Sequence, residues 1–295
     1  MTDQTSPDSV DRPSMVGDRP SIARASMLPP PLPTPAEERR AKLLGFLNHL
    51  GRIFEMTVGT VKAGFRRPFE WGEIVRQLET VGVKSLGIVI VTSVFVGMVM
   101  AVQFAFGLRK FGGLEYTGRV IALTFARELS PTLTAVIVGG RIGAGMAAEV
   151  GSMAVTEQID AIRALGADPL KKLVWPRLVA SVIVIPVVGM FSLYLGFGGA
   201  MLIVDTQFDI PAAFFYTSAL ETLQMMDVMA GLIKTPFFGA IIALTGCYFG
   251  MTTTGGTAGV GNSTTRTVVV ISIAILIADF FLTKFVIALW PSAAE

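Results

Sequence analysis

Long apolar stretches separated by short polar segments dominate the pattern of this chain. The 24 residues of 85–108 and the whole of 178–204 contain no charged side chain. A helix of that first length extends about 36 Å, whereas the apolar layer of a membrane is about 30 Å thick. The pattern predicts an all-α integral membrane protein with five transmembrane helices. They are predicted near residues 83–108, 120–150, 175–204, 227–251 and 267–290.

Before the first span, apolar residues recur with the period of a helix. The spacings of three and four residues predict an amphipathic helix over 37–66, accompanied by several Lys and Arg residues. Such a helix can lie in the membrane interface, or it can pack on other protein. The residues of the stripe are Leu43, Leu47, Leu50, Phe54, Val58, Val61 and Phe65.

The first 36 residues differ in composition from the rest. They hold eight of the 16 prolines, together with Ser, Asp and Arg, and no apolar segment typical of a cleaved signal peptide. A segment of this kind buries too little apolar surface to fold. Residues 1–36 are therefore predicted to be a disordered tail, and 37–295 one membrane domain.

The distribution of Lys and Arg predicts the orientation. One set of connecting segments carries 17 basic residues and the alternating set carries three, counted from the sequence. Because basic residues concentrate on the cytoplasmic side, the N-terminus is predicted inside and the C-terminus outside. The basic set is 1–84, 149–177 and 251–266, and the other set is 109–119, 205–226 and 291–295.

Composition excludes several classes of chemistry. A net charge of +2 is too small to indicate nucleic-acid binding, and one thiol is not a metal site. The single histidine argues against zinc sites built on His and against Ser-His-Asp chemistry. The sequence contains no G-x-x-x-x-G-K-[ST] motif, and the glycine-rich residues 250–261 lack the lysine that follows such a loop. No catalytic residue is assigned, so any ATP hydrolysis belongs to another chain.

A short helix is predicted in the segment between the second and third spans. Thr156 is a candidate N-cap, Glu157 follows in the first turn, and Gly166 with Pro169 ends the helix. The polar residues Glu157, Asp160 and Arg163 share one face, and Val155, Ile159 and Ile162 share the other; Gln158 lies between them. The charged face suits docking to a soluble partner, but a simple connector explains the spacing equally well.

Three ionisable residues fall inside predicted spans, where they are candidates for a functional role. At 1.5 Å per residue, Glu128, Lys234 and Asp279 all lie about 10–12 Å below the outer surface. An unpaired charge at such a depth costs about 2.5–3.5 kcal/mol on insertion scales. We therefore predict that the three side chains form a cluster inside the bundle, either to fix helix register or to line a cavity or hinge.

Two prolines lie close to this predicted cluster. Pro131 and Pro236 each free a backbone carbonyl four residues earlier, which is tolerated where protein or a water-filled cavity satisfies it. Arg141 and Glu149 lie near the opposite end of the second span and are expected to anchor it or to pair with the following loop. Lys284 is close enough to a span end to extend into the interface.

Two motifs carry a resemblance to a known family. The run Gly139-Gly-Arg-Ile-Gly-Ala-Gly-Met-Ala-Ala-Glu149 and the segment Thr156-Glu157-Gln158-Ile159, followed by Gly166 and Asp168-Pro169, closely resemble the MlaE (YrbE) permeases. These are membrane subunits of Mce-type ABC transporters of bacteria and plastids. The resemblance covers about residues 40–290 and includes the later Gly255–Thr265 stretch.

The resemblance implies an interfacial helix with five spans, a homodimer, two ABC ATPase subunits that bind ATP and Mg, and an Mce-domain protein on the outer side. It implies that 156–166 is the coupling helix and that charged residues stand at Glu128, Lys234 and Asp279. The cargo would be phospholipid or a similar lipid, and the location the bacterial inner membrane. The expected lipid pocket lies on the first and last spans, with Val91, Phe95, Met98 and Val102 as candidates.

Two other functions remain compatible with the residues. An ion-coupled secondary transporter of a hydrophobic substrate could use Glu128 and Asp279 as proton sites, although no internal repeat is detectable. A membrane scaffold without transport activity is the third hypothesis. The presence of a stoichiometric ATPase distinguishes the first function from the other two.

Overall fold

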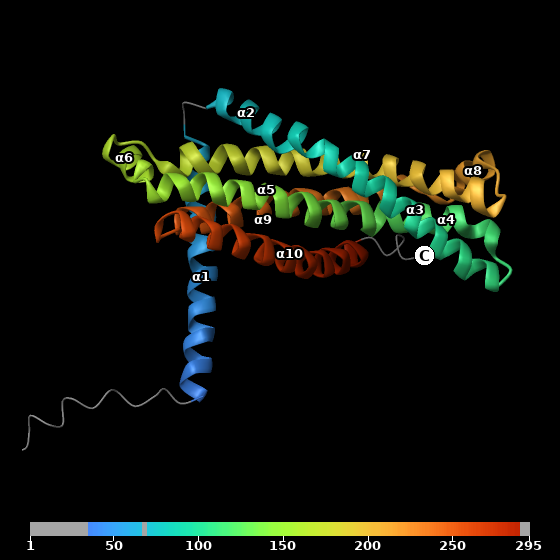
Figure 1. Ribbon diagram of the computed structural model, residues 1–295, viewed down its shortest axis with the longest axis horizontal. Helices are drawn as coiled ribbons and strands as arrows, with labels where there is room; N and C mark the ends of the chain where they lie inside the picture. The colour runs from blue at the N-terminus through green and yellow to red at the C-terminus, as the bar shows by residue number, and fades with distance from the viewer. Residues whose placement is uncertain (1–34, 67–69, 290–295) are drawn as a thin grey trace, which may run out of the picture. The chain divides into compact units, whose positions relative to one another are not determined.

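The computed structural model describes residues 35–66 and 70–289, and within them helices and short connections account for the whole fold (Figure 1). The chain divides into two units, residues 1–48 and 49–295. The predicted tail lies outside the described residues, except that Pro35 and Ala36 begin a helix. The helices are α1 (Pro35–Gly64), α2 (Trp71–Gly82), α3 (Leu86–Lys110), α4 (Thr117–Thr124), α5 (Ser130–Val155), α6 (Gln158–Ala164), α7 (Trp175–Phe208), α8 (Ala212–Thr222), α9 (Met225–Met251) and α10 (Gly256–Leu289).

The described residues contain five helical segments long and apolar enough to cross a membrane, and the predicted all-α membrane fold with five spans is confirmed. The first three segments are composite. A 3₁₀ turn at Val83–Ser85 joins α2 to α3, and π-helical turns at Phe125–Leu129 and Leu170–Val174 precede α5 and α7. The five segments are Trp71–Lys110, Leu114–Val155, Leu170–Phe208, Met225–Met251 and Gly256–Leu289.

Two elements differ from the sequence-based bounds. The helix α2 was not predicted from the sequence. Its charged residues are typical of a loop, and its apolar face, on which Ile74 and Val81 are buried, is short. The helix α10 begins at Gly256, eleven residues before the predicted edge at 267. Gly255 and Gly256 both have positive φ, which lets the chain reverse tightly after α9 and start the last helix early.

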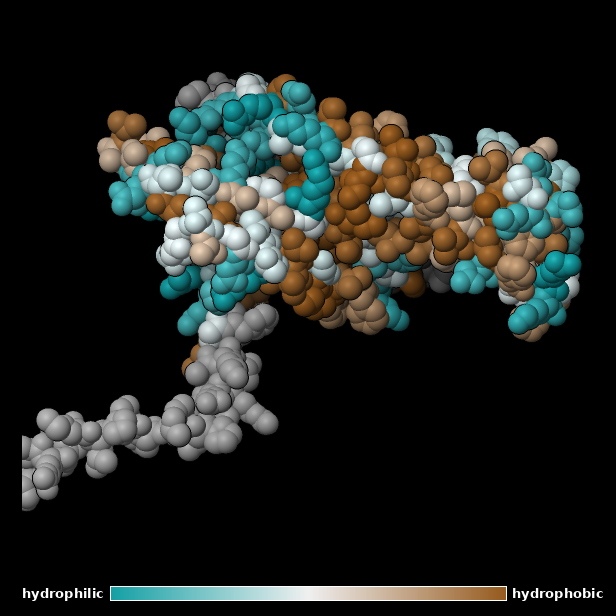
Figure 2. Space-filling model, in the orientation of Figure 1, coloured by the Kyte–Doolittle hydropathy of each residue, from teal (hydrophilic) through white to brown (hydrophobic). Residues whose placement is uncertain are grey.

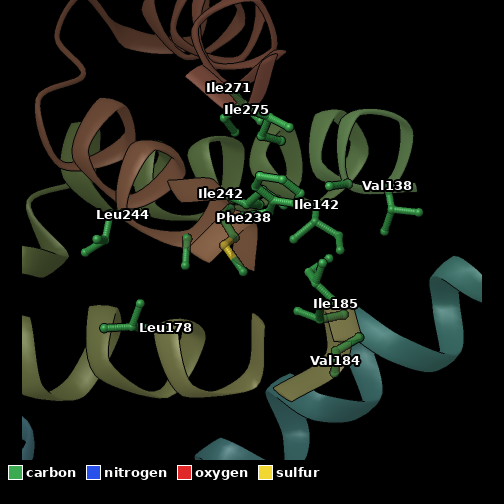
Figure 3. Close-up of a cluster of buried hydrophobic side chains, with 14 of the residues drawn as sticks. Val138, Ile142, Leu178, Val184, Ile185, Phe238, Ile242, Leu244, Ile271 and Ile275 are labelled. Carbon is green, nitrogen blue, oxygen red and sulfur yellow. The ribbon is translucent and has the colours of Figure 1, made fainter. Parts of the chain in front are cut away.

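The core of the bundle is formed by four helices whose apolar faces meet. Side chains from α5, α7, α9 and α10 converge in one cluster (Figure 3). The outer helix α3 packs mainly on α7, and α10 packs on α5 and α9. Of the apolar stretches in the first and last spans, only 28% and 17% of residues are buried, so both present broad apolar faces. The labelled core residues include Val138, Ile142, Leu178, Ile185, Phe238, Ile242, Ile271 and Ile275.

The surface pattern fits a membrane protein. On the face drawn in Figure 2, apolar residues cover the middle of the bundle and hydrophilic residues gather towards its two ends. Helix α6 lies at one end and α8 at the other (Figure 1). We refer to these as the α6 end and the α8 end.

The second half of α1 exposes the predicted stripe. Leu50 and Phe54 on α1 and Phe65 just after it are 54%, 71% and 72% exposed, although Phe65 lies against Trp175 with their ring centroids 5.7 Å apart. The opposite side packs instead, with Thr60 and Ala63 buried. The side chains of Leu43 and Leu47 lie outside the described residues. An interfacial position for this helix stays a prediction.

Glycine allows the two helices α3 and α7 to approach closely. A Cβ added at Gly97 would lie 1.9 Å from the backbone oxygen of Gly196, whereas a Cβ at Gly87 on the same helix would meet nothing within 4 Å. Close approach of backbones through small residues is a common way in which membrane helices associate.

We expect Gly97→Val to lower the free energy of unfolding by about 1–3 kcal/mol, because the added methyl groups force α3 away from α7. The matched variant Gly87→Val should change it little. Unfolding of both variants in mixed detergent micelles measures the difference. Equal stability of the two variants would show that this close approach is not a constraint.

Candidate functional site: a charged cavity within the bundle

The structure brings Glu128, Lys234 and Asp279 together. The Lys234 ammonium lies 2.7 Å from Glu128 Oε2 and 3.0 Å from Asp279 Oδ1, and it donates a third hydrogen bond to Thr283 Oγ1 at 3.0 Å. Lys234 therefore uses all three of its N–H donors. The threonine was missed in the sequence, although it follows Asp279 by four residues and so lies on the same helix face.

Local structure explains how these side chains reach one another. Glu128 lies in the π-helical turn Phe125–Leu129, where the extra residue shifts the direction of the side chains relative to an α-helix. Lys234 lies on α9, and its side chain is only 2% exposed. Asp279 on α10 is 18% exposed and Glu128 is 40% exposed. The ammonium is thus enclosed, while Glu128 opens onto the surface of the site.

A second ion pair lies beside the first. Arg127 Nε donates to Asp227 Oδ1 at 2.7 Å, and the carboxylate of Asp227 is 4% exposed. Asp227 Oδ2 also accepts the backbone N–H of Gln224 at 2.8 Å, which caps the first turn of α9. Sequence analysis assigned no role to either residue. An acid at the start of the fourth span and a base beside Glu128 in the second span could have indicated this pair. The two ion pairs connect the π-helical turn to α9 at two points.

Arg127, Glu128, Lys234 and Thr283 line an open cavity of about 330 Å³ in the half of the bundle nearer α8, and Asp227 and Asp279 pair with two of them. One part of its wall is charged and the rest is apolar. Counting Arg127 and Lys234 against Glu128, Asp227 and Asp279 leaves one negative charge in excess. The lining residues are Leu123, Thr124, Arg127, Glu128, Ala230, Lys234, Thr283, Val286 and Ile287.

The proline at the third turn of α9 is accommodated locally. Pro236 cannot donate to the carbonyl of Leu232, and Thr235 Oγ1 donates to that carbonyl instead, at 2.7 Å. Pro131 occupies the first turn of α5, directly after the π-helical turn. Both prolines thus lie close in sequence to cavity residues, Pro131 after Glu128 and Pro236 after Lys234.

The four candidates for the lipid pocket lie elsewhere. Val91 and Phe95 on α3 are 57% and 60% exposed, and Met98 and Val102 are partly buried further along that helix. None of the four lines the cavity around Lys234. Val91 and Phe95 belong to the apolar face that α3 presents to its surroundings, whereas Val102 packs against a buried apolar cluster. The role of the four residues as a pocket stays a prediction.

The predicted coupling segment forms α6, with one correction to its start. Thr156 is not the N-cap, because its hydroxyl donates back to the Ser152 carbonyl at 2.8 Å and so ends α5. Glu157 takes the N-cap position with a left-handed φ of 60°. The predicted C-terminal cap is observed, since Gly166 has a φ of 77° and its N–H donates to the Arg163 carbonyl at 2.9 Å.

One face of α6 is anchored and the other is free. Ile159 is buried against Val150 and Leu173, and Ile162 packs on the same cluster. On the exposed face, Arg163 pairs with Asp160 at 2.8 Å, and Gln158 Nε2 donates to Thr156 Oγ1 at 3.1 Å. Leu165 is 86% exposed, which is unusual for a leucine and was not noted in the sequence. The segment therefore projects both charged and apolar groups at the α6 end.

Another buried ion pair connects this end to the spans. Arg177 at the start of α7 is 2% exposed and lies 2.9 Å from the carboxylate of Glu149 on α5. It also donates to the Leu173 carbonyl at 2.6 Å, within the adjoining π-helical turn. Glu149 was expected to anchor its helix or to pair with the following loop; its partner is instead the first turn of the next span. Movement of the segment around α6 is thereby tied to α5 and α7.

Comparisons with known proteins decide the family. Residues 74–285 match the family described as Permease MlaE. That range includes the charged cavity and α6. The chain belongs to the MlaE permease family.

Relatives support this membership across most of the chain. TRIGALACTOSYLDIACYLGLYCEROL 1, a chloroplastic protein of Arabidopsis thaliana, is 42% identical over 215 residues, which are 73% of this chain and 61% of the plant protein. The chain thus spans less than two thirds of that relative. A probable ABC transporter permease protein of Synechocystis is 43% identical, covering 70% of this chain and 79% of its own length. A Rickettsia conorii protein of the same description is 37% identical, covering 81% and 92%.

This MlaE permease should depend for stability on the pairing of Lys234. Replacing it by Met leaves two carboxylates without their cation in an apolar layer, so we expect a loss of about 3–5 kcal/mol in the free energy of unfolding. The triple variant Glu128→Gln/Lys234→Met/Asp279→Asn should recover much of that loss, because it removes the charges together. Unfolding in mixed micelles measures both.

The exposed Lys284 supplies the control for this comparison, because Lys284→Met removes a cation from the same helical region without disturbing the network. A triple variant as unstable as Lys234→Met alone would show that the charges themselves do not account for the cost.

Proposed function

We propose that this chain is the membrane subunit of an ATP-driven ABC transporter that moves phospholipid or a similar hydrophobic lipid. The observation that carries the proposal is the cavity around Lys234. It combines a polar wall, formed by Arg127 and Glu128 of the π-helical turn, Lys234 of α9 and Thr283 of α10, with apolar side chains such as Leu123 and Val286. An open cavity with both surfaces suits a molecule that has a polar head and an apolar body.

Membership of the family supports lipid as the cargo. The plant relative carries the name of a galactosyl glycerolipid, and the relatives from Synechocystis and Rickettsia are described as ABC transporter permeases. A wholly apolar cavity would offer no means to hold a head group. Here Arg127 has guanidinium N–H donors beyond those used by Asp227, and Glu128 is partly exposed.

The energy source lies on another subunit in this proposal. The sequence contains no phosphate-binding loop motif, so ATP and Mg would bind two separate ABC ATPase subunits. Those subunits would dock on α6, whose exposed side presents Glu157, Asp160, Arg163 and Leu165. The anchored side, with Ile159 and Ile162 packed on the spans, would transmit their movement to the bundle.

The remaining parts of the assembly follow from the same proposal. A second copy of the chain would cover part of the apolar faces of α3 and α10, including Val91 and Phe95, so that the cavity is completed between two copies. The α6 end would face the cytoplasm, as the excess of Lys and Arg in its connecting segments indicates. An Mce-domain protein would take or deliver lipid at the α8 end of a transporter in the bacterial inner membrane.

Filling the cavity should stop transport without dismantling the complex. Ala230→Phe places a ring in the 330 Å³ cavity beside Lys234, and we expect at least about a tenfold loss in ATP-dependent lipid transfer between reconstituted vesicles. ATPase association should persist. Val187→Phe, on the exposed face of α7, is the matched control. Normal transfer by Ala230→Phe, or transfer driven by a proton gradient without any ATPase, would contradict this proposal; the second result would favour an ion-coupled carrier using Glu128 and Asp279.

Changing the exposed tip of the α6 segment should instead weaken assembly. Leu165→Asp introduces a charge where an apolar contact with the ATPase is proposed, and we expect at least about a tenfold lower affinity for that subunit. Leu220→Asp, an exposed leucine at the α8 end, is the control. Co-purification and ATP hydrolysis measure the effect. If Leu165→Asp retained the ATPase as the wild type does, the docking surface would lie elsewhere.

A further inference from the structure

A second cavity of about 330 Å³ lies between α2 and α5, in the half of the bundle nearer α6. Its wall includes two cations, Lys84 and Arg141. Arg141 lies 13 residues after Glu128 along the same span, which corresponds to about 20 Å of helix. The two cavities are therefore separate.

The two cations of this second cavity have no carboxylate partner among the described residues. Arg127, Lys234 and Arg177 each form an ion pair, whereas neither Lys84 nor Arg141 has a carboxylate within 4.0 Å in the part of the chain that the structure describes. The cavity's own acid, Glu149, is engaged by Arg177 at 2.9 Å. The wall consequently carries unbalanced positive charge.

The cavity lies at the depth where lipid head groups are found. Lys84 directly precedes the uncharged residues 85–108, and Arg141 Nη1 donates to Ser85 Oγ at 2.8 Å, so both cations mark the same edge of the apolar layer. From these cations the cavity extends towards the α6 end, where Val81 and Met146 are buried in its wall. A Cβ added at Gly145 would meet nothing within 4 Å, so there is room beside the helix.

We infer that this cavity binds the phosphate of an anionic phospholipid from the leaflet at the α6 end. Basic pockets between transmembrane helices recognise such head groups, because Lys and Arg donate charge-assisted hydrogen bonds to phosphate oxygens. The acyl chains of the lipid extend from the cations towards the α8 end, along the uncharged residues that follow Lys84. The bound lipid bridges α2 and α5 and so fixes the position of α2, the helix that leads into the first span.

Titration of the delipidated full chain in detergent, with bound lipids counted by native mass spectrometry, tests this site. We expect phosphatidylglycerol to bind more tightly than phosphatidylcholine, and diacylglycerol not to bind. Lys84→Gln/Arg141→Gln should weaken phosphatidylglycerol binding by about tenfold for each cation removed. Arg109→Gln/Lys110→Gln removes two exposed cations from the other end of α3 and should leave binding unchanged. Equal binding by wild type and Lys84→Gln/Arg141→Gln would overturn the inference.

Three further arms separate the alternatives. Gly145→Phe should block lipid binding without changing the charge of the site. If this variant changes the mass of the oligomer but leaves lipid binding unchanged, a second copy of the chain covers the cavity and the inference fails. Excess inorganic phosphate should not displace the lipid, and displacement would show a site for the free ion. Ala230→Phe should leave this binding intact, so failure of the proposed transport function is distinguishable from failure of this site.

Discussion

The architecture depends on the enclosed ammonium of Lys234. A charge in the apolar layer of a membrane is costly unless it is paired, and here three acceptors from two other segments meet it. Those contacts require the π-helical turn, α9 and α10 to keep one relative position, since a shift of one residue along any of them would separate a charge from its partner. The cavity follows from this arrangement. At the depth of Lys234, α10 contacts the π-helical turn through polar side chains and not through close apolar packing.

Irregular backbone is concentrated where the molecule must present chemistry. The π-helical turn Phe125–Leu129 orients Glu128 and Arg127, and a second π-helical turn at Leu170–Val174 supplies a carbonyl to the buried Arg177. The left-handed residue Glu157 starts α6. The first of these turns is held to α9 by the pairing of Arg127 with Asp227. Such departures in the middle of long helices commonly accompany functional sites.

Charge is distributed differently at the two ends of the spans. Towards α8, cations and carboxylates are paired around one cavity with a small negative excess. Towards α6, Arg177 neutralises Glu149, and Lys84 and Arg141 have no carboxylate nearby among the described residues. The same span that carries Glu128 in one cavity carries Arg141 in the other. Movement of this span would therefore alter both cavities.

The sequence by itself determined the membrane fold, because uncharged stretches of 24 residues and more are long enough to cross the apolar layer and only helices satisfy their own backbone there. It also indicated that Glu128, Lys234 and Asp279 should meet, since the cost of an unpaired charge leaves few alternatives. The same argument could have identified Thr283 and the pair Arg127–Asp227.

Tertiary structure alone decided the rest. Helix α2 and the π-helical turns depend on packing and not on local propensity, and Thr156 ends one helix where local pattern made it the start of another. The pairing of Arg177 with Glu149 joins residues 28 positions apart, and no periodicity relates them. Likewise, the cavity at Lys84 and Arg141 depends on the position of Ser85, whose hydroxyl accepts a hydrogen bond from Arg141 on α5. Hydrophobic pattern specifies which face of a helix is buried, but the partner of each buried polar group is fixed by three-dimensional proximity.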